Sequence, residues 1–144
     1  MAHARQQIRE AVYTLLNAWG VWDVYETRIY PVEITDKVAI CIYTLNETVT
    51  ESTLNNDQLR SLQMAVEIKA KALASVDDDL DEAAGAVEQI LAADDTFSGL
   101  AKRSDLVETE VDYFDELEKR AAVMRLIYDV QYRVNKSNPN VIVT

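Results

Sequence analysis

At 144 residues the chain has the length of one ordinary domain, long enough to bury a core without disulfides or a structural metal. Its 25 acidic residues against 14 basic residues give a net charge of −11, which argues against a surface that binds nucleic acid by neutralising phosphates. No run of about 20 apolar residues occurs and residues 1–6 lack an apolar signal region, so we expect no membrane span, no signal peptide and a cytoplasmic protein in the cell that makes it.

The first predicted element is an amphipathic helix. Apolar residues recur at a spacing of three and four and form one stripe: Ile8, Val12, Leu15, Leu16 and Trp19. Gly20 follows the last of them and is suited to closing the helix in the left-handed conformation. Residues 21–22 are then expected to fold back over the apolar stripe.

Three strands are predicted next. Residues 24–30 form the first and end at Pro31, and residues 38–45, apolar on both faces, form a central buried strand that contains the single cysteine. Strict alternation over residues 59–73 favours a third, long strand with one apolar and one wet face. Residues 46–57 are predicted to be a polar loop, functional or mobile at that length, in which only Val49 and Leu54 reach the core.

A second helix and a hairpin follow. Leu80, Val87 and Leu91 mark a helix that ends near Asp94, capped by Ser75 or Asp77 and with acids 77–79 at the positive end of its dipole. Residues 106–113 alternate as a strand with 107, 109, 111 and 113 on one face. After a turn at 115–118, residues 122–134 alternate over a final strand that pairs with it.

The order of helix, three strands, helix and two strands predicts an α+β fold, with two helices packed on a mostly antiparallel sheet of about five strands. We expect residues 1–134 to form a single α+β domain. Residues 135–144 are polar and turn-prone, so they are interpreted as a flexible C-terminal tail or, alternatively, as an arm that adds to the sheet of a neighbour.

A calcium-loop template is matched in part by acids near the start of the second helix. Asp77, Asp79, Asp81 and Glu88 occupy its positions one, three, five and twelve, but position six is Glu82 instead of glycine. Helical periodicity also continues through these residues. We therefore predict no metal site, and weak divalent-ion binding at Asp77, Asp79 and Asp81 stays open.

Other chemical signatures of an enzyme are weak. His3, the only histidine, is close to the amino terminus and is not expected to act as a positioned base, and the three glycines are too isolated to cradle a phosphate. Tyr128 and Tyr132 are interpreted as core residues with hydroxyls at the edge, or alternatively as interface residues. No catalytic residue, cofactor-binding residue or cofactor is predicted, and the chain is not expected to be an enzyme.

Several stretches in order resemble the minor tail protein U-like family of tailed bacteriophages, the tail terminators. They are residues 2–12 (AHARQQIREAV), 28–31 (RIYP), 42–47 (IYTLNE), 80–82 (LDE), 100–102 (LAK) and 130–133 (VQYR). The specificity lies in their order and spacing over nearly the whole chain. The helices-on-sheet fold of the family agrees with the fold expected from the residue pattern.

The resemblance implies a non-enzymatic virion protein that forms a ring, usually a hexamer. Such a ring caps the head-proximal end of the tail tube, stops its polymerisation and offers a surface for joining the head. The implied partners are copies of the chain itself, the tail-tube protein and a head-completion or neck protein, while DNA passes through the channel without specific binding. The alternatives are another head–tail neck or tail-tube adaptor ring protein or, in a different class, a small acidic enzyme or ligand-binding domain.

A closed ring requires two different patches on each subunit. We expect them among an exposed edge strand, the polar segment 46–57 and the hairpin tip 114–120. The candidate interface residues are Thr48, Glu51, Thr53, Asn55, Asn56, Asp57, Phe114, Glu116, Leu117 and Glu118. As a further hypothesis, some of the acidic excess lines the channel so that passing DNA is not retained.

Overall fold

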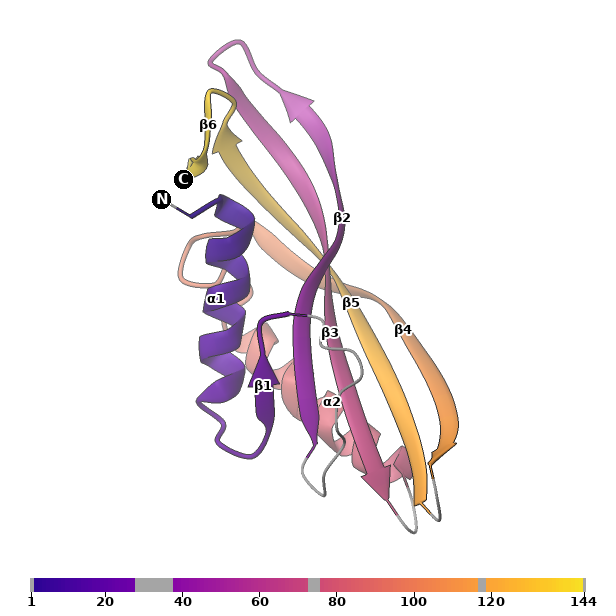
Figure 1. Cartoon of the computed structure of the whole chain (residues 1–144). Coiled ribbons are helices and arrows are strands. Elements are labelled where there is room, and N and C mark those ends of the chain that lie inside the picture. The colour runs from indigo at the N-terminus through magenta and orange to yellow at the C-terminus, as the bar shows by residue number, and fades with distance from the viewer. Residues whose placement is uncertain (1, 28–37, 73–75, 117–118, 144) are drawn as a thin grey trace.

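The computed structural model describes residues 2–27, 38–72, 76–116 and 119–143 and places two helices on one face of a twisted sheet (Figure 1). In chain order the elements are α1 (Ala4–Asn17), β1 (Asp23–Tyr25), β2 (Ala39–Ser52), β3 (Asp57–Ala72), α2 (Val76–Ala93), β4 (Arg103–Glu116), β5 (Lys119–Asn135) and β6 (Asn138–Ile142). The strand order is β1-β2-β3-β5-β4, β6 pairs with β5, and only β1 and β2 run parallel. This confirms the predicted α+β fold, with one strand more than expected.

The first helix forms over the predicted apolar stripe as far as Leu16, whereas Trp19, the last predicted member, lies beyond the end of α1 and is exposed. Ile8, Val12 and Leu16 are fully buried on the side that faces the sheet. Gly20 adopts a left-handed conformation with φ +76°, and its N–H donates to the carbonyl of Asn17 at 3.1 Å, so the predicted closure of α1 is confirmed. Of the two residues expected to fold back, Trp22 joins the core and Val21 stays exposed.

The second helix also matches its prediction. Leu80, Val87 and Leu91 are buried, and three aspartates occupy the first turn of α2, where the helix dipole favours negative charge. The helix is continuous from residue 76 to residue 93, so the acids of the calcium-loop template lie on a helix and not in a loop. Ser75, one of the two predicted caps, lies outside the described residues.

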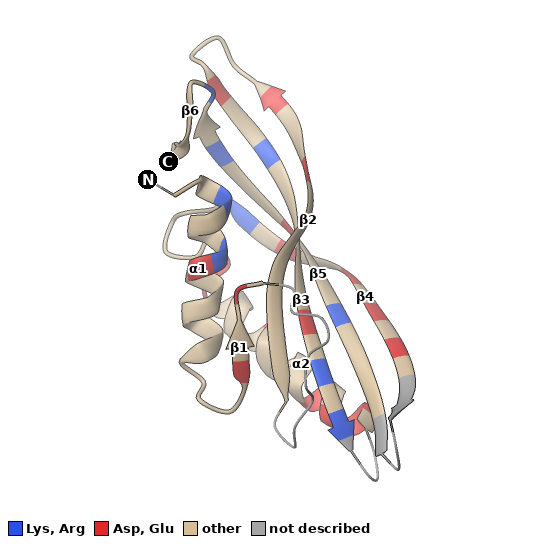
Figure 2. Cartoon of the chain, in the orientation of Figure 1, with Lys and Arg blue, Asp and Glu red and all other residues tan. Residues whose placement is uncertain are grey.

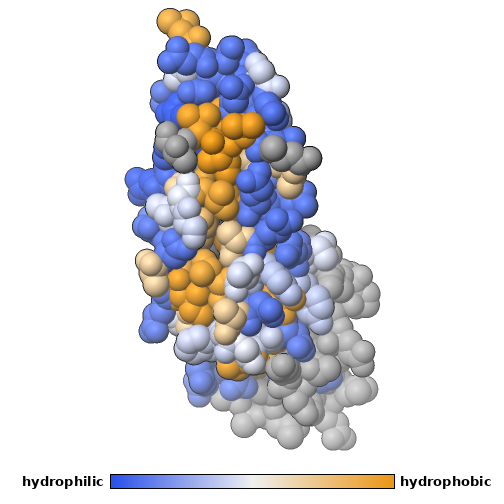
Figure 3. Space-filling view, turned by 90° about the vertical axis from the view of Figure 1, so that its left-hand side faces the viewer, coloured by the Kyte–Doolittle hydropathy of each residue, from blue (hydrophilic) through white to orange (hydrophobic). Residues whose placement is uncertain are grey.

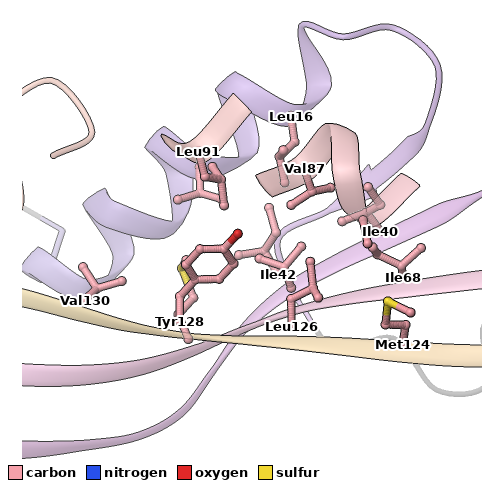
Figure 4. Close-up of a cluster of buried hydrophobic side chains, with 14 of the residues drawn as sticks. Leu16, Ile40, Ile42, Ile68, Val87, Leu91, Met124, Leu126, Tyr128 and Val130 are labelled. Atoms are coloured by element: carbon pink, nitrogen blue, oxygen red, sulfur yellow. The ribbon is translucent and has the colours of Figure 1, made fainter. Parts of the chain in front are cut away.

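The core lies between the helices and the face of the sheet that they cover (Figure 4). Alternate residues of the three inner strands point into it, and each large apolar side chain buried there contributes about 1.5–3 kcal/mol relative to exposure. The labelled members are Leu16, Ile40, Ile42, Ile68, Val87, Leu91, Met124, Leu126, Tyr128 and Val130.

Two strand boundaries differ from the sequence prediction. β1 covers only residues 23–25 and pairs in parallel with the start of β2, while the rest of the expected strand at 28–30 lies outside the described residues. β2 begins as predicted but continues to Ser52 through the segment predicted to be a loop. Thr48 and Val49 are β-branched and pair with the long β3, and pairing resumes at Glu51 after a register shift, so strand propensity and pairing outweigh the polarity of the segment.

The predicted burial of β3 is wrong for one of its two faces. Its apolar face packs as predicted, but the face expected to be wet contains Ala65, Glu67 and Lys69, which are all buried. β3 lies between β2 and β5, and its neighbours across the strands include Tyr43 and Ile127, whose large side chains cover a central strand from both sides.

A bulge changes the predicted faces of β4. The register shifts between Leu106 and Glu108, so Val107 is the extra residue and is exposed. Leu106 and Val111 pack against the core instead, and Tyr113 is exposed and donates to Oδ1 of Asp77 at 2.6 Å. The predicted hairpin of β4 with β5 is confirmed, although part of its turn, residues 117–118, lies outside the described residues.

The C-terminal residues are paired within the chain. From residue 135 the sequence predicts a flexible tail or a segment that adds to the sheet of a neighbour. In the structure residues 138–142 instead form β6 on β5, and the N–H of Val143 donates to the carbonyl of Arg133 at 2.8 Å. The side chain of Gln7 on α1 also donates to the carbonyl of Asn140 at 2.9 Å. Backbone pairing needs few apolar side chains, which is why composition does not reveal this strand.

Candidate assembly interface

The sheet continues past the amino-terminal end of α1 as a projection that we call the arm, residues 46–60 of β2 and β3 (Figure 1). β5 supports it along one side, because Asp57 pairs with Asn135 and Arg60 pairs with Tyr132. Strand pairing on both sides of β3 makes the arm a rigid extension of the sheet, whereas the sequence predicts a polar loop that is functional or mobile.

The tip of the arm is a tight turn that polar residues close. Thr53 donates its N–H to the carbonyl of Asp57 at 2.8 Å and accepts from the N–H of Asp57 through its hydroxyl at 3.3 Å. Asn56 takes a left-handed conformation with φ +63°, which asparagine tolerates better than most residues. Lys136, between β5 and β6, donates its N–H to the carbonyl of Asn56 and thereby ties the two turns together.

The tip presents an apolar side chain to solvent. Leu54 is fully exposed and Val49 lies half exposed on the same hairpin, so both predictions that placed these residues in the core are wrong. Figure 3, viewed towards α1 and the C-terminal strand, shows an isolated apolar projection at the end of the arm and an apolar stripe between hydrophilic surfaces below it. Single exposed apolar side chains are common on protein surfaces, but Leu54 protrudes at the end of the sheet, where another protein can cover it.

A charged network fixes the base of the arm to α1. Glu47 on β2 accepts from the guanidinium of Arg5 at 2.5 Å, from that of Arg60 at 3.4 Å and from the hydroxyl of Tyr132. Tyr132 is fully buried, and burial together with the hydrogen bond to Glu47 raises its pKa. Nearby, Arg9 donates to the hydroxyl of Thr44 at 2.9 Å. These contacts hold the arm at one angle to the helical body.

His3 caps the helix that carries this network. Its Nδ1 accepts from the N–H of Arg5 at 3.0 Å, so His3 is the N-cap of α1. Burial and the positive charge of Arg5 lower the pKa of His3 from its ordinary value of 6.5. Both the cap and its cationic neighbours therefore require the neutral imidazole.

Protonation of His3 is expected to destabilise the fold. Because its pKa is lower in the folded chain than in the unfolded chain, the stability is present above pH 6.5 and is lost as the pH falls through the folded-state pKa. NMR titration of this single histidine should give a pKa below 6.5. His3→Asn, which keeps a neutral cap, should lose less stability than the natural chain between pH 7 and pH 5 in urea unfolding. An equal loss in both would contradict the role of His3.

The structure brings six of the ten predicted interface residues together on the arm. Thr48, Glu51, Asn55 and Asn56 are exposed, and Thr53 and Asp57 are half-buried in the turn. The backbone of Phe114 and Glu116 lies at the far end of the sheet, in the last residues of β4, where Glu116 pairs with Lys119. Leu117 and Glu118 lie outside the described residues. The two predicted patches are therefore at opposite ends of the sheet.

Sequence reasoning missed the network that positions the arm. Glu47 and Tyr132 are 85 residues apart, and Glu47 and Arg5 are 42 apart, so no local spacing connects them. One signal is present in hindsight. Glu47 and Arg60 are ordinary polar residues by type, but both fall on the strand face that continues the buried row of Leu62 and Met64.

In the part of the chain that the structure describes, no three side chains of His, Cys, Asp or Glu are grouped so that they could hold a metal ion. Neither α1 nor α2 is long and apolar enough to cross a membrane.

Comparison with known proteins assigns the chain to a family. The sequence profile of the phage minor tail protein U family matches residues 3–132. No curated protein matches the sequence. Among solved structures, a chain from the virion of a native gene transfer agent particle is similar in fold, with a TM-score of 0.53 and 14% identity over 85% of this chain and 93% of that chain. Because the family profile covers nearly the whole sequence, this chain belongs to the phage minor tail protein U family.

Proposed function

We propose that this phage tail structural protein is a tail terminator. In this proposal it forms a ring, with six subunits as the expected number, at the head-proximal end of the tail tube in the virion. There it stops polymerisation of the tube and offers the surface to which the head is joined. The observation that carries the proposal is the rigid arm with a fully exposed leucine at its tip, which suits a contact with the next layer of a stacked assembly.

The positions of the two predicted patches suit a ring or a stack. A ring closes when one patch of each subunit contacts a different patch of the next, and a stack needs one surface for each neighbouring layer. The arm tip and the end of the β4–β5 hairpin lie at opposite ends of one sheet, so each can meet a different neighbour. The partners proposed on this basis are further copies of the chain, the tail-tube protein and a head-completion or neck protein.

The acidic residues suggest how DNA passes such a ring. Asp105, Glu108, Glu110 and Asp112 follow one another along β4, where Figure 2 shows a row of acidic positions. In our proposal this row faces the channel, where Glu108 and Asp112, which form no described ion pair, repel the phosphates and keep DNA from binding. Asp105 and Glu110 are already paired with Arg103 and Arg125. A ring structure with these residues on the outer wall would refute this part of the proposal.

Removal of the exposed leucine at the arm tip should impair tail assembly and leave folding unchanged. Leu54→Ser in the phage should give tails with overlong tubes and a lower yield of joined particles, because the arm loses the side chain that its partner covers. Tail lengths are measured by electron microscopy. The purified variant should keep its melting temperature, since substitutions of exposed residues change stability by only about 0.5 kcal/mol.

Val107→Ser provides a matched control, because Val107 is an exposed apolar residue on β4, away from the arm. Tails of normal length are expected from it. If Leu54→Ser instead gives tails of normal length that lack heads, the chain is a neck or adaptor protein and the terminator proposal is wrong.

A further inference from the structure

A groove separates the end of α1 and the following loop from the first half of α2, with a volume of about 540 Å³. Trp19, Val21 and Trp22 form one wall, and residues of α2 form the other. The groove is distinct from the arm, because its walls come from the loop after α1, from Val38 and from α2, and not from residues 46–60. Its two walls have different chemistry.

The first wall is an aromatic platform. The rings of Trp19 and Trp22 stack with centroids 6.2 Å apart and planes at 25°. Trp22 is buried, whereas Trp19 is 54% exposed, and the neighbouring Val21 is exposed as well. The buried ring of Trp22 therefore packs against one face of the exposed ring of Trp19. An indole face held open in this way is a favourable surface for a flat or cationic group.

The second wall is acidic. Asp79, Asp81 and Glu82 line the groove from the first turns of α2, and all three are exposed. None of them forms an ion pair with another described residue. Aspartates in the first helical turn are explained by the dipole of α2, but the dipole does not explain why an exposed tryptophan lines the same groove.

An aromatic wall opposite an acidic wall favours an arginine side chain as the ligand. A guanidinium group is planar, so it stacks on an indole face, and it donates two parallel hydrogen bonds to a carboxylate. A lysine ammonium offers neither the plane nor the fork. The apolar part of the wall, Trp19 and Val21, then suits apolar side chains beside the arginine.

We propose that this groove binds a segment of another protein that carries an arginine flanked by apolar residues. A second copy of this chain is the poorer occupant, because each arginine whose side chain the structure describes already has a polar contact within its own chain. The proposal does not depend on ring formation or on the terminator role, since it rests only on the two walls of the groove.

The two tryptophans of the chain both lie in the groove, so their fluorescence reports on it directly. The probe is a blocked Leu-Arg-Leu tripeptide, titrated into the full chain at low salt. We expect a saturable change in fluorescence. The analogue with citrulline in place of arginine keeps the shape but not the charge, and it should bind about tenfold more weakly, the effect of losing one charge-assisted hydrogen bond.

Two double variants with the same loss of charge locate the site. Asp81→Asn with Glu82→Gln should weaken binding of the arginine peptide by about tenfold, again by the loss of charge-assisted hydrogen bonds. Glu108→Gln with Asp112→Asn removes two exposed acids on β4 and should leave binding unchanged. Equal weakening in both would show general attraction to an acidic surface and overturn the proposal. Equal affinity for the citrulline peptide would also overturn it.

Discussion

Replacement of Glu47 by alanine is expected to lower the free energy of unfolding by about 3 kcal/mol, the typical cost of removing one partner from a buried ion pair. The expected loss is large because two largely buried side chains lose the partner that Glu47 provides. The guanidinium of Arg60, whose side chain is 14% exposed, loses its only described ion-pair partner, and the hydroxyl of the fully buried Tyr132 loses its acceptor. A lost surface contact would cost far less, about 0–1 kcal/mol.

Urea unfolding of the purified variant measures this loss, and Glu51→Ala is its matched control. Glu51 is also a β2 glutamate paired with an arginine, but its side chain is 55% exposed and its distance to Arg133 is 3.9 Å. The control should lose about 0.5 kcal/mol or less. Similar losses in the two variants would contradict the view that Glu47 fixes the arm.

The loss of Glu47 should also release the arm from α1. Hydrogen exchange of the backbone amides in residues 46–60 should become faster in Glu47→Ala, while the amides of the β4–β5 hairpin keep their rates. Faster exchange throughout the sheet would instead mean that Glu47 supports the whole fold and not the arm in particular.

The parts of the fold that the sequence predicts well are those with a strong hydrophobic period. α1, α2, β3 and β5 each repeat their apolar residues over three or more turns or pairs, and all four were placed correctly. The distal half of β2 carries no such period, because both of its faces are polar or exposed. Its strand character comes from β-branched residues and from pairing with β3, and pairing partners are not visible in a local pattern.

Burial of charge is the other feature that local patterns miss. Lys69 and Glu67 read as the wet side of an amphipathic strand, yet both are buried because β3 lies in the middle of the sheet. The candidate interface residues remain a prediction, but the structure shows which of them lie together. Exposed polar residues at the arm tip are evident from composition, whereas the network that orients them depends on residues brought together only by the fold.

The buried charge of Glu67 leads to the second large effect. Arg125 on β5 pairs across the sheet with Glu67 at 3.7 Å and with Glu110 at 3.2 Å, and its guanidinium lies 6.0 Å from the centre of the Tyr43 ring. Glu67 is buried, whereas the side chain of Glu110 is 46% exposed. Arg125→Met should therefore lower the free energy of unfolding by about 2 kcal/mol, because Glu67 loses its described cation.

Removal of both partners should cost less than removal of one. In the variant with Arg125→Met and Glu67→Met, no buried carboxylate remains without its cation, so most of the lost stability is expected to return. Glu110→Ala, which deletes only the exposed partner, should cost about 0.5 kcal/mol. Urea unfolding of these variants decides between two origins of the effect. If the loss of unfolding free energy in the double variant equals the sum of the losses in the two single variants, the stability comes from packing of the two side chains and not from compensation of a buried charge.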